Sequence, residues 1–452
     1  MVYRRKIYDK LLNWKEKAQG KKALIIEGAR RIGKSTIVKE FAKREYTSHI
    51  VIDFNDASPT VMDCFEHHLG DLDTFFMILS TEYKVQLHRS KSLIVFDEVQ
   101  RYPKARQSVK LLVKDGRYDY IETGSLISLR ESVRDITIPS EERMIRMNPM
   151  DFEEFAWACG EEELIKYIKL CFSKKESLEP GLHHKAMMLF KQYMLVGGMP
   201  QSVSAFLDNG HSFDDADAEK RDILTLYRND IMRIGAKYRS RVITIFDQIP
   251  SFLSQHEKRI VFSQVSEGSF FGQYSETFFW LTDSMIANEC FNCTDPNVGL
   301  SMNEDRTLIK CYMGDTGLLV SHAFDENELV ESSLYRQILH DKLSINKGML
   351  YENVIAQQLV SNGHRLFFYN HYNPTLHRND MEVDFLLTNQ SKTNLKLFPI
   401  EVKSSGNYRT TSLENFVKKY HDRIATAYII HPKTLMQKGE IIAIPPYMTI
   451  CL

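Results

Sequence analysis

The sequence has no excess of either charge, because 58 lysines and arginines stand against 59 aspartates and glutamates in 452 residues. A chain with this balance has no overall field that would draw it to nucleic acid or to an anionic membrane, so any such binding has to be local. Long hydrophobic runs are also missing, since no segment reaches the roughly 18 uncharged apolar residues that a membrane span requires. We therefore expect a cytoplasmic protein without a membrane partner.

Cysteine is scarce, and low-complexity tracts and internal repeats are absent. Seven cysteines scattered over 452 residues do not make a disulfide framework, which is typical of a reducing compartment. Cys290, Cys293 and Cys311 lack a fourth partner at a finger-like spacing, so we interpret them as apolar side chains and not as zinc ligands. At about 100 to 200 residues per domain, the length predicts two to four domains.

One stretch near the N-terminus has a pattern with a definite chemistry. Residues 28–35, GARRIGKS, satisfy G-x-x-x-x-G-K-[ST] between a β-type run at 23–26 and a helical run at 36–43. Its glycines let the backbone turn around a phosphate, and the following helix adds the positive end of its dipole. The pattern predicts a nucleotide site formed by Gly28, Ala29, Arg30, Arg31, Ile32, Gly33, Lys34, Ser35 and Thr36.

A second segment supplies the carboxylates that such a loop needs. Residues 92–98, SLIVFDE, form an apolar run that ends in two acids, as expected of a buried strand that ends at the carboxyl edge of a sheet. Lys34 would reach the β- and γ-phosphates, while Ser35 and Asp97 would hold Mg²⁺. Glu98 would polarise the attacking water, so the two segments together predict ATP and Mg²⁺ as ligands.

Further apolar runs at 49–54, 118–123 and 144–147 alternate with helical stretches. This alternation predicts a parallel sheet that is covered on both faces. Thr123 and Ser125 follow one of these strands and could sense the γ-phosphate, although ordinary turn residues are the alternative.

Six segments resemble, in order, those of a large group of prokaryotic AAA-type ATPases whose core precedes a C-terminal region of unknown function. They are GARRIGKST, LIVFDEVQRYP, TGSLISL, NPMDFEEF, VGGMP and GDTGLL. The resemblance implies a P-loop ATPase core at 1–150. Relatives carry a Gly-Arg pair before NPMDFEEF, where this chain has Glu142-Arg143, so Arg143 is a candidate sensor or trans-acting arginine. A trans-acting arginine would require a homo-oligomer.

Two further regions follow the predicted core. Apolar residues at three- and four-residue steps predict packed helices over 151–235, which we interpret as the helical lid of the ATPase. Relatives place a winged helix over 236–330, with a recognition helix at 273–282 carrying Tyr274, Ser275 and Thr277, near Lys258 and Arg259. Acidic residues balance the basic ones there, so a role in joining domains is the alternative to binding DNA.

The last region, 331–452, reads as a helix at 349–355 followed by strand-like runs at 365–369, 381–387 and 398–403. Its spacing resembles a PD-(D/E)XK nuclease, that is, a restriction-endonuclease-like α/β domain. Residues i and i+2 of a strand share a face, so Glu401 and Lys403 point the same way and Asp384 can meet them from the partner strand. The resemblance implies that Asp384 and Glu401 ligate a second Mg²⁺ or Mn²⁺, that Lys403 orients the water and that Glu352 supports the metal.

The predicted fold is therefore α/β and multidomain, with a P-loop parallel sheet, a helical lid, a winged-helix-like domain and a nuclease-like domain. Two functions stay open. In the first, ATP hydrolysis controls a metal-dependent nuclease that acts on DNA. In the second, the chain is a nucleotide-dependent switch whose C-terminal domain binds DNA or a protein partner without cutting.

Overall fold

The computed structural model describes residues 2–18, 20–124, 140–255, 258–260, 278–324, 332–340, 346–373, 378–388 and 396–452. It divides into two compact units, the first comprising residues 1–148 and 283–285 and the second comprising 149–282 and 286–452. Among the described helices, none is long and apolar enough to cross a membrane.

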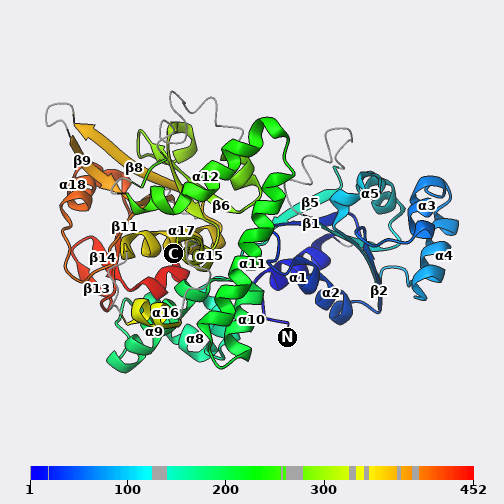
Figure 1. Cartoon of the computed structure of the whole chain (residues 1–452), viewed down its shortest axis with the longest axis horizontal. Coiled ribbons are helices and arrows are strands. Elements are labelled where there is room, and N and C mark those ends of the chain that lie inside the picture. Colours follow the sequence, from blue (N-terminus) through cyan, green and yellow to red (C-terminus); the bar gives the residue numbers. More distant parts are fainter. Residues whose placement is uncertain are drawn as a thin grey trace. The chain divides into compact units, whose positions relative to one another are not determined.

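The first unit is built on five parallel strands in the order β2-β3-β4-β1-β5 (Figure 1). The strands are β1 (Ala23–Glu27), β2 (Ser48–Asp53), β3 (Ser92–Asp97), β4 (Asp119–Gly124) and β5 (Glu142–Arg146). Every residue of β1 and β3 is buried, because helices cover both faces of a parallel sheet and leave no polar side. The predicted parallel sheet is confirmed.

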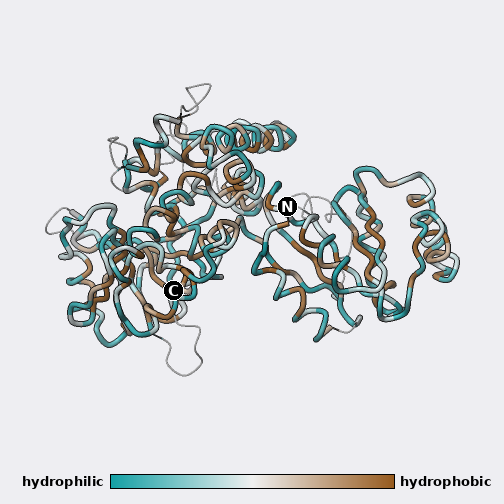
Figure 2. The backbone as a smooth tube through the Cα atoms, turned by 90° about the horizontal axis from the view of Figure 1, so that it is seen from below, coloured by the Kyte–Doolittle hydropathy of each residue, from teal (hydrophilic) through white to brown (hydrophobic). Residues whose placement is uncertain are grey.

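Helices alternate with these strands. They are α1 (Ile7–Ala18), α2 (Lys34–Glu45), α3 (Pro59–His67), α4 (Leu72–Tyr83), η1 (Val99–Arg101) and α5 (Pro103–Asp115). Ile25 and Ile94 share one apolar core with residues of α3, α4 and α5, whereas α2 packs on the strands through Ile37, Val38 and Phe41. In Figure 2 the hydrophobic segments of this unit run through its interior, with hydrophilic segments outside them.

The second unit begins with a run of helices, which confirms the predicted helical region. They are α7 (Phe152–Ala158), α8 (Glu162–Lys174), α9 (Pro180–Val196), α10 (Pro200–Asp208), α11 (Phe213–Met232) and α12 (Ala236–Ser254). Asp151 caps α7 by accepting a hydrogen bond from the Glu154 backbone N–H, and the Glu154 side chain in turn accepts one from the Asp151 N–H. This reciprocal capping box fixes where the first helix starts.

Two mixed sheets complete the second unit. One has the order β7-β6-β8-β9 and the other β10-β11-β12-β14-β13. The strands are β6 (Ala287–Cys293), β7 (Glu304–Met313), β8 (Leu366–Asn373), β9 (Arg378–Val383), β10 (Phe385–Thr388), β11 (Leu397–Val402), β12 (Ala427–Ile430), β13 (Met436–Lys438) and β14 (Ile441–Ile444). The remaining helices are α15 (Thr316–Ala323), α16 (Ser332–Leu339), α17 (Lys347–Ser361) and α18 (Thr411–Lys419), with the 3₁₀ turns η2 (Leu300–Asn303), η3 (His421–Arg423) and η4 (Pro446–Cys451).

The region predicted to be a winged helix contains the antiparallel pair β6 and β7. Strand β6 also pairs with β8 in parallel, so this hairpin belongs to a sheet that it shares with the C-terminal strands. The side chains proposed to face a groove, Tyr274, Ser275 and Thr277, lie outside the described residues. A winged helix therefore stays a prediction.

Helix α17 is buried over almost its whole length and holds several elements of the second unit together. Asn353 accepts a hydrogen bond from the Met313 N–H and donates to the Met313 carbonyl, which fixes the end of β7. Gln357 accepts from the backbone and the hydroxyl of Thr316, both at 2.8 Å, at the start of α15. Gln358 donates to the hydroxyl of Tyr193 at 2.8 Å. These buried amides satisfy backbone groups that would otherwise lack partners.

The motifs VGGMP and GDTGLL meet at a close junction between the end of α9 and the start of α15. Asp315 accepts hydrogen bonds from the backbone N–H groups of Gly198 at 2.5 Å and Leu318 at 3.0 Å. A Cβ on Gly198 would lie 2.0 Å from the Met150 carbonyl oxygen, and a Cβ on Gly317 would lie 2.6 Å from the Gly197 Cα. The glycines are required because two backbones touch, which explains both motifs as packing elements.

Replacing Gly198 by alanine should therefore lower the free energy of unfolding by more than about 2 kcal/mol, because backbone atoms have to move to admit the methyl group. The matched control is Gly181→Ala in α9, where a Cβ would meet nothing within 4 Å. We expect the control to be neutral or slightly stabilising. Denaturant unfolding of both variants checks this, and equal stabilities would contradict the packing account.

Candidate functional site

The loop predicted to bind phosphate joins β1 to α2, as the sequence pattern requires. Arg31 and Gly33 have φ angles of 67° and 91°, in the left-handed region. Left-handed residues next to right-handed ones turn successive N–H groups into a concave anion-binding nest. Glycine is required at position 28 for a different reason. A Cβ at this position would lie 2.5 Å from the Met147 carbonyl oxygen. Packing against the chain after β5 therefore requires this glycine.

Lys34 is buried within the loop and folds back on it. Its Nζ donates hydrogen bonds to the carbonyl oxygens of Gly28 at 2.9 Å and Ala29 at 2.8 Å. Burial lowers the pKa of the ammonium group to about 8, and the carboxylates of Glu98 and Asp97 act in the opposite direction. The loop thus holds a desolvated cation, which is a favourable arrangement for receiving a phosphate.

Asp97 joins three separate segments at the carboxyl end of β3, where its side chain is only 3% exposed. Its Oδ1 accepts a hydrogen bond from the Ser35 hydroxyl at 2.6 Å and another from the Thr123 hydroxyl. Lys39 Nζ lies 3.5 Å from Oδ2. Ser35, at the start of α2, and Thr123 of β4 therefore converge on the one carboxylate that ends β3.

A hydroxyl and a carboxylate are the hard oxygen ligands that Mg²⁺ prefers. Ser35 and Asp97 supply both at one point beside Lys34, so the residues present fit a magnesium ion. The same three side chains were predicted from the sequence, where the loop and the strand lie about sixty residues apart.

Glu98 follows Asp97 in a strained backbone conformation, with a φ of 55°. Its backbone N–H donates to the Thr123 hydroxyl at 3.3 Å, and its side chain accepts a hydrogen bond from Gln100 Nε2 at 2.6 Å. Gln100 therefore holds the carboxylate proposed to polarise water. The sequence analysis missed this residue, because a glutamine two positions after an acid carries no distinctive pattern.

The other two predicted sensor residues are Ser125 and Arg143. Ser125 lies outside the described residues. Arg143 is exposed on the edge strand β5, and within the described part of the chain no hydrogen bond or ion pair joins it to the loop. Its neighbour Glu142 is the buried member of the pair and forms an ion pair with Arg106 at 2.9 Å. A role for Arg143 toward a second chain stays a prediction.

The four residues predicted to form a nuclease site come from α17, the junction of β9 and β10, and the end of β11. Lys403 Nζ lies 2.5 Å from Glu401 Oε1, and Asp384 Oδ2 accepts a hydrogen bond from the Val402 N–H at 2.8 Å. Asp384, Glu401 and Lys403 are thus brought together by β11, as the strand spacing predicted.

Glu352 is in a different environment from the one predicted. Both of its carboxylate oxygens are occupied: Oε2 by Lys258 Nζ, and Oε1 by the Tyr312 hydroxyl and by Lys310 Nζ at 3.2 Å. Burial would raise the pKa of this carboxyl group, but the two lysines outweigh it and hold the pKa at about 2. Glu352 is therefore an ionised carboxylate that has a lysine partner on each of its two oxygens.

Lys310 on β7 lies at the centre of the same cluster with a side chain that is 1% exposed. Its Nζ is 3.6 Å from Glu382 Oε1 and 3.6 Å from Asp384 Oδ1. Burial alone would lower the pKa of this lysine, yet the surrounding carboxylates raise it above its ordinary value. Among the described residues, no group of three or more histidines, cysteines, aspartates or glutamates is arranged to hold a metal ion.

Glu401 differs from Glu352 in its protonation. Burial, partly offset by Lys403, raises the pKa of this carboxyl group to about 7. Its Oε2 is buried without a hydrogen-bond partner in the structure. A carboxyl group in these surroundings exchanges a proton near neutrality, so it could serve either as a proton carrier or as a ligand.

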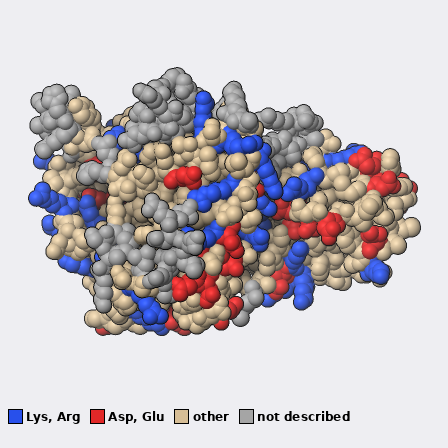
Figure 3. All heavy atoms as spheres, in the orientation of Figure 1, with Lys and Arg blue, Asp and Glu red and all other residues tan. Residues whose placement is uncertain are grey.

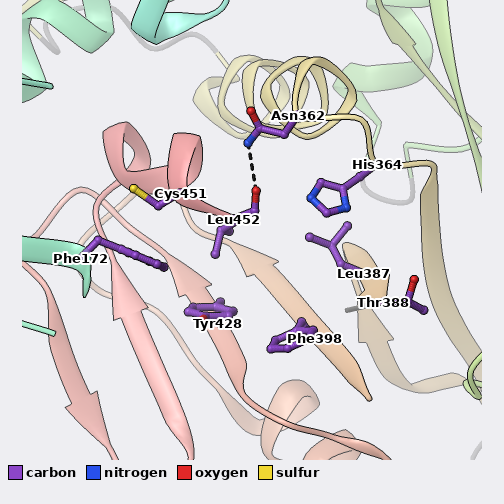
Figure 4. A pocket seen from close by; sticks show the side chains of 9 residues that line it. All are labelled: Phe172, Asn362, His364, Leu387, Thr388, Phe398, Tyr428, Cys451 and Leu452. Carbon is purple, nitrogen blue, oxygen red and sulfur yellow. Dashed lines mark hydrogen bonds between the residues drawn. The ribbon is translucent and has the colours of Figure 1, made fainter. Parts of the chain in front are cut away.

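The second unit also contains a cavity of about 360 Å³ (Figure 4). Aromatic rings of Phe172, Phe398 and Tyr428 line it, and Asn362 at its rim donates a hydrogen bond to the Leu452 carbonyl oxygen at 3.0 Å. Phe398 and Glu401 are three positions apart on β11, so they point to opposite faces of that strand. The cavity is therefore separate from the carboxylate cluster.

Comparison with protein families identifies three regions of the chain. Residues 20–156 match the model of an AAA domain. Residues 187–328 and 347–448 match two domains of unknown function, DUF8612 and DUF4143. The chain thus carries an AAA-type P-loop domain followed by two domains without an assigned function. No curated protein matches it.

Solved structures show only a distant likeness. The Walker-type ATPase PABY2304 of Pyrococcus abyssi is 14% identical to this chain, with a TM-score of 0.39. The match covers 71% of this chain and 96% of the Pyrococcus abyssi chain. The Aeropyrum pernix ORC1 protein in complex with DNA is 9% identical with a TM-score of 0.28, covering 72% and 93%. CDC6P from Pyrobaculum aerophilum is 12% identical with a TM-score of 0.24, covering 74% and 92%.

The lowered pKa of Lys34 predicts a pH dependence of nucleotide binding. Below about pH 7.5 the lysine is charged before binding, so the affinity for Mg-ATP should be flat; above its pKa of about 8 the free site has lost its proton. Binding must then take up a proton, and the dissociation constant should rise by up to about tenfold per pH unit. Calorimetry at pH 8.5 in two buffers of different ionisation enthalpy measures this uptake. Tight binding without proton uptake would contradict the assignment.

Proposed function

We propose that this chain binds Mg-ATP at the loop around Lys34 and hydrolyses it. The observation that supports this most strongly is the convergence of Ser35, Asp97 and Thr123 on one point beside a buried lysine. A strand-to-helix turn without a ligand would have no need for a desolvated ammonium group next to a buried carboxylate. The matching AAA domain over 20–156 agrees with this reading.

In the proposed mechanism the loop N–H groups and Lys34 hold the β- and γ-phosphates in line for attack. Ser35 and Asp97 would hold Mg²⁺, which would neutralise charge on the phosphate oxygens. Glu98 takes a proton from the water that attacks the γ-phosphorus, and ADP leaves with the electron pair of the broken bond. Thr123, bonded to Asp97 and to the Glu98 N–H, links the metal ligand to the base.

Two substitutions separate binding from chemistry. Lys34→Ala should weaken Mg-ATP binding by at least about tenfold, because the only buried cation described in the loop is lost. Glu98→Gln should keep binding and lower kcat by about 100-fold or more, because the amide accepts no proton. Glu163→Gln, at a side chain that is 84% exposed, is the matched control and should leave both unchanged. If both site variants hydrolyse ATP normally, the assignment fails.

For the C-terminal region, we propose a binding role in which the nucleotide state of the first unit controls contact with DNA or a protein partner. The pairing of Glu352 with Lys258 and Lys310 favours this over cleavage, because the carboxylate is already neutralised. The face shown in Figure 3 carries basic and acidic side chains interspersed, so a DNA contact would be local.

A second candidate is a metal-dependent nuclease of the PD-(D/E)XK type, with Asp384, Glu401 and Lys403 in its site. Two observations favour it. The order α17, β8, β9 with β10, and β11 follows the helix and the three strand-like runs predicted from the sequence, and Glu401 and Lys403 lie side by side at the end of β11. Glu352, the fourth residue of the pattern, is paired with Lys258 and Lys310 instead.

A cleavage assay distinguishes the two candidates. Incubation with single- and double-stranded DNA, Mg²⁺ or Mn²⁺ and each nucleotide should give no cleavage by the wild type beyond that of Lys403→Ala. Cleavage that is lost in both Asp384→Asn and Lys403→Ala would instead establish the nuclease and rule out the binding role as the sole function.

A further inference from the structure

We propose that Lys310 is the built-in cation of the C-terminal carboxylate cluster and occupies the position that a divalent metal would take among Glu352, Glu382 and Asp384. This inference concerns the second unit alone and does not depend on ATP hydrolysis. It assigns a role to a residue that neither the nuclease pattern nor the family matches single out.

The ammonium group of Lys310 lies close to three carboxylates. Lys310 Nζ lies 3.2 Å from Glu352 Oε1, 3.6 Å from Glu382 Oε1 and 3.6 Å from Asp384 Oδ1. One ammonium group therefore faces three carboxylates that come from α17, from β9 and from the junction of β9 and β10. A divalent ion that bound these three oxygens would have to occupy the volume that the ammonium group fills.

The charged groups of this cluster are largely shielded from solvent. The side chains of Lys310 and Glu352 are each 1% exposed, and that of Asp384 is 15% exposed. A charged lysine that is buried in this way is strongly disfavoured unless carboxylates neutralise it. Buried carboxylates are disfavoured in turn unless a cation neutralises them. Each stabilises the charged form of the other, which agrees with the raised pKa of Lys310 and the lowered pKa of Glu352.

The surroundings of Lys310 leave it little freedom to move aside. Its Nζ lies over the ring of Phe368, 5.1 Å from the centroid. The Tyr312 hydroxyl, two residues further along β7, donates to the same Glu352 oxygen. Lys258 holds the other oxygen of Glu352. Two lysines and a tyrosine thus place a donor on each oxygen of Glu352 and fix the cluster.

The expected charge balance supports the same conclusion. Three lysines, Lys258, Lys310 and Lys403, face the four carboxyl groups of Glu352, Glu382, Asp384 and Glu401. Three lysines against four carboxyl groups leave at most one net negative charge, so a further two positive charges would leave the cluster with an excess.

The test replaces the lysine and asks whether a metal can substitute for it. Lys310→Met should lower the melting temperature by about 5 to 10 °C in the presence of a chelator, because the buried Glu352 and the partly buried Glu382 and Asp384 lose a counter-ion. Added Mn²⁺ should restore a large part of that loss in the variant and leave the wild type unshifted, since only the variant has an open site. Lys438→Met, at a side chain that is 89% exposed, is the matched control and should show neither effect.

A second variant keeps the test decisive if Lys310→Met alone is too unstable to purify. Lys310→Met combined with Glu352→Gln removes one charge of each sign, so it should be more stable than the single variant and bind Mn²⁺ more weakly. The proposal is overturned if Mn²⁺ stabilises the wild type and Asp384→Asn abolishes that effect, or if Lys310→Met is as stable as the Lys438→Met control. Because the readout is unfolding without nucleotide, a failure here leaves the ATPase assignment untouched.

Discussion

The first unit depends on one buried carboxylate, that of Asp97. Its Oδ1 receives hydrogen bonds from Ser35 and Thr123, which lie 62 and 26 residues away along the chain. A carboxylate with 3% exposure would be strongly destabilising without these donors. The interaction therefore ties the phosphate loop to two neighbouring strands. It places the proposed metal ligand, the proposed sensor hydroxyl and the proposed catalytic carboxylate at the same edge of the sheet.

The second unit is organised by α17 in a comparable way. Three of its amide side chains form hydrogen bonds with other elements: Asn353 with β7, Gln357 with α15 and Gln358 with α9. Glu352, one residue before Asn353, accepts hydrogen bonds from Lys258, Lys310 and Tyr312. A helix that carries so many buried polar groups is stable only when each group has its partner. The same helix thus joins the helical region to the strands and carries the residue whose pairing decides how the carboxylate cluster behaves.

Much of the first unit could be predicted from the sequence, because its signals are local. The apolar runs of β1 and β3 are fully buried, and the loop pattern between strand and helix fixes the place of Lys34 and Ser35. The strand period likewise predicted that Glu401 and Lys403 share a face. In each case a short stretch of sequence determines which side chains lie together.

The rest depends on contacts between distant segments, which no local pattern reveals. Lys310 and Glu352 are 42 residues apart, and only the fold shows that they meet. A lysine inside the apolar run TLIKCYM was the available signal, since a charge within a buried strand requires a partner. The glycines of VGGMP and GDTGLL were likewise visible as motifs. Glycine is required there because two backbones approach closely, and this contact exists only in the folded chain.

The central claim is that the groups around Asp97 form a magnesium and triphosphate site. A crystal structure with Mg²⁺ and a non-hydrolysable ATP analogue tests it most directly. The account predicts that Lys34 Nζ leaves the carbonyl oxygens of Gly28 and Ala29 for the phosphates, and that the Ser35 hydroxyl and the Asp97 carboxylate contact the metal or its water ligands. A nucleotide bound elsewhere, or bound at the loop with Lys34 still on those carbonyls, would contradict it.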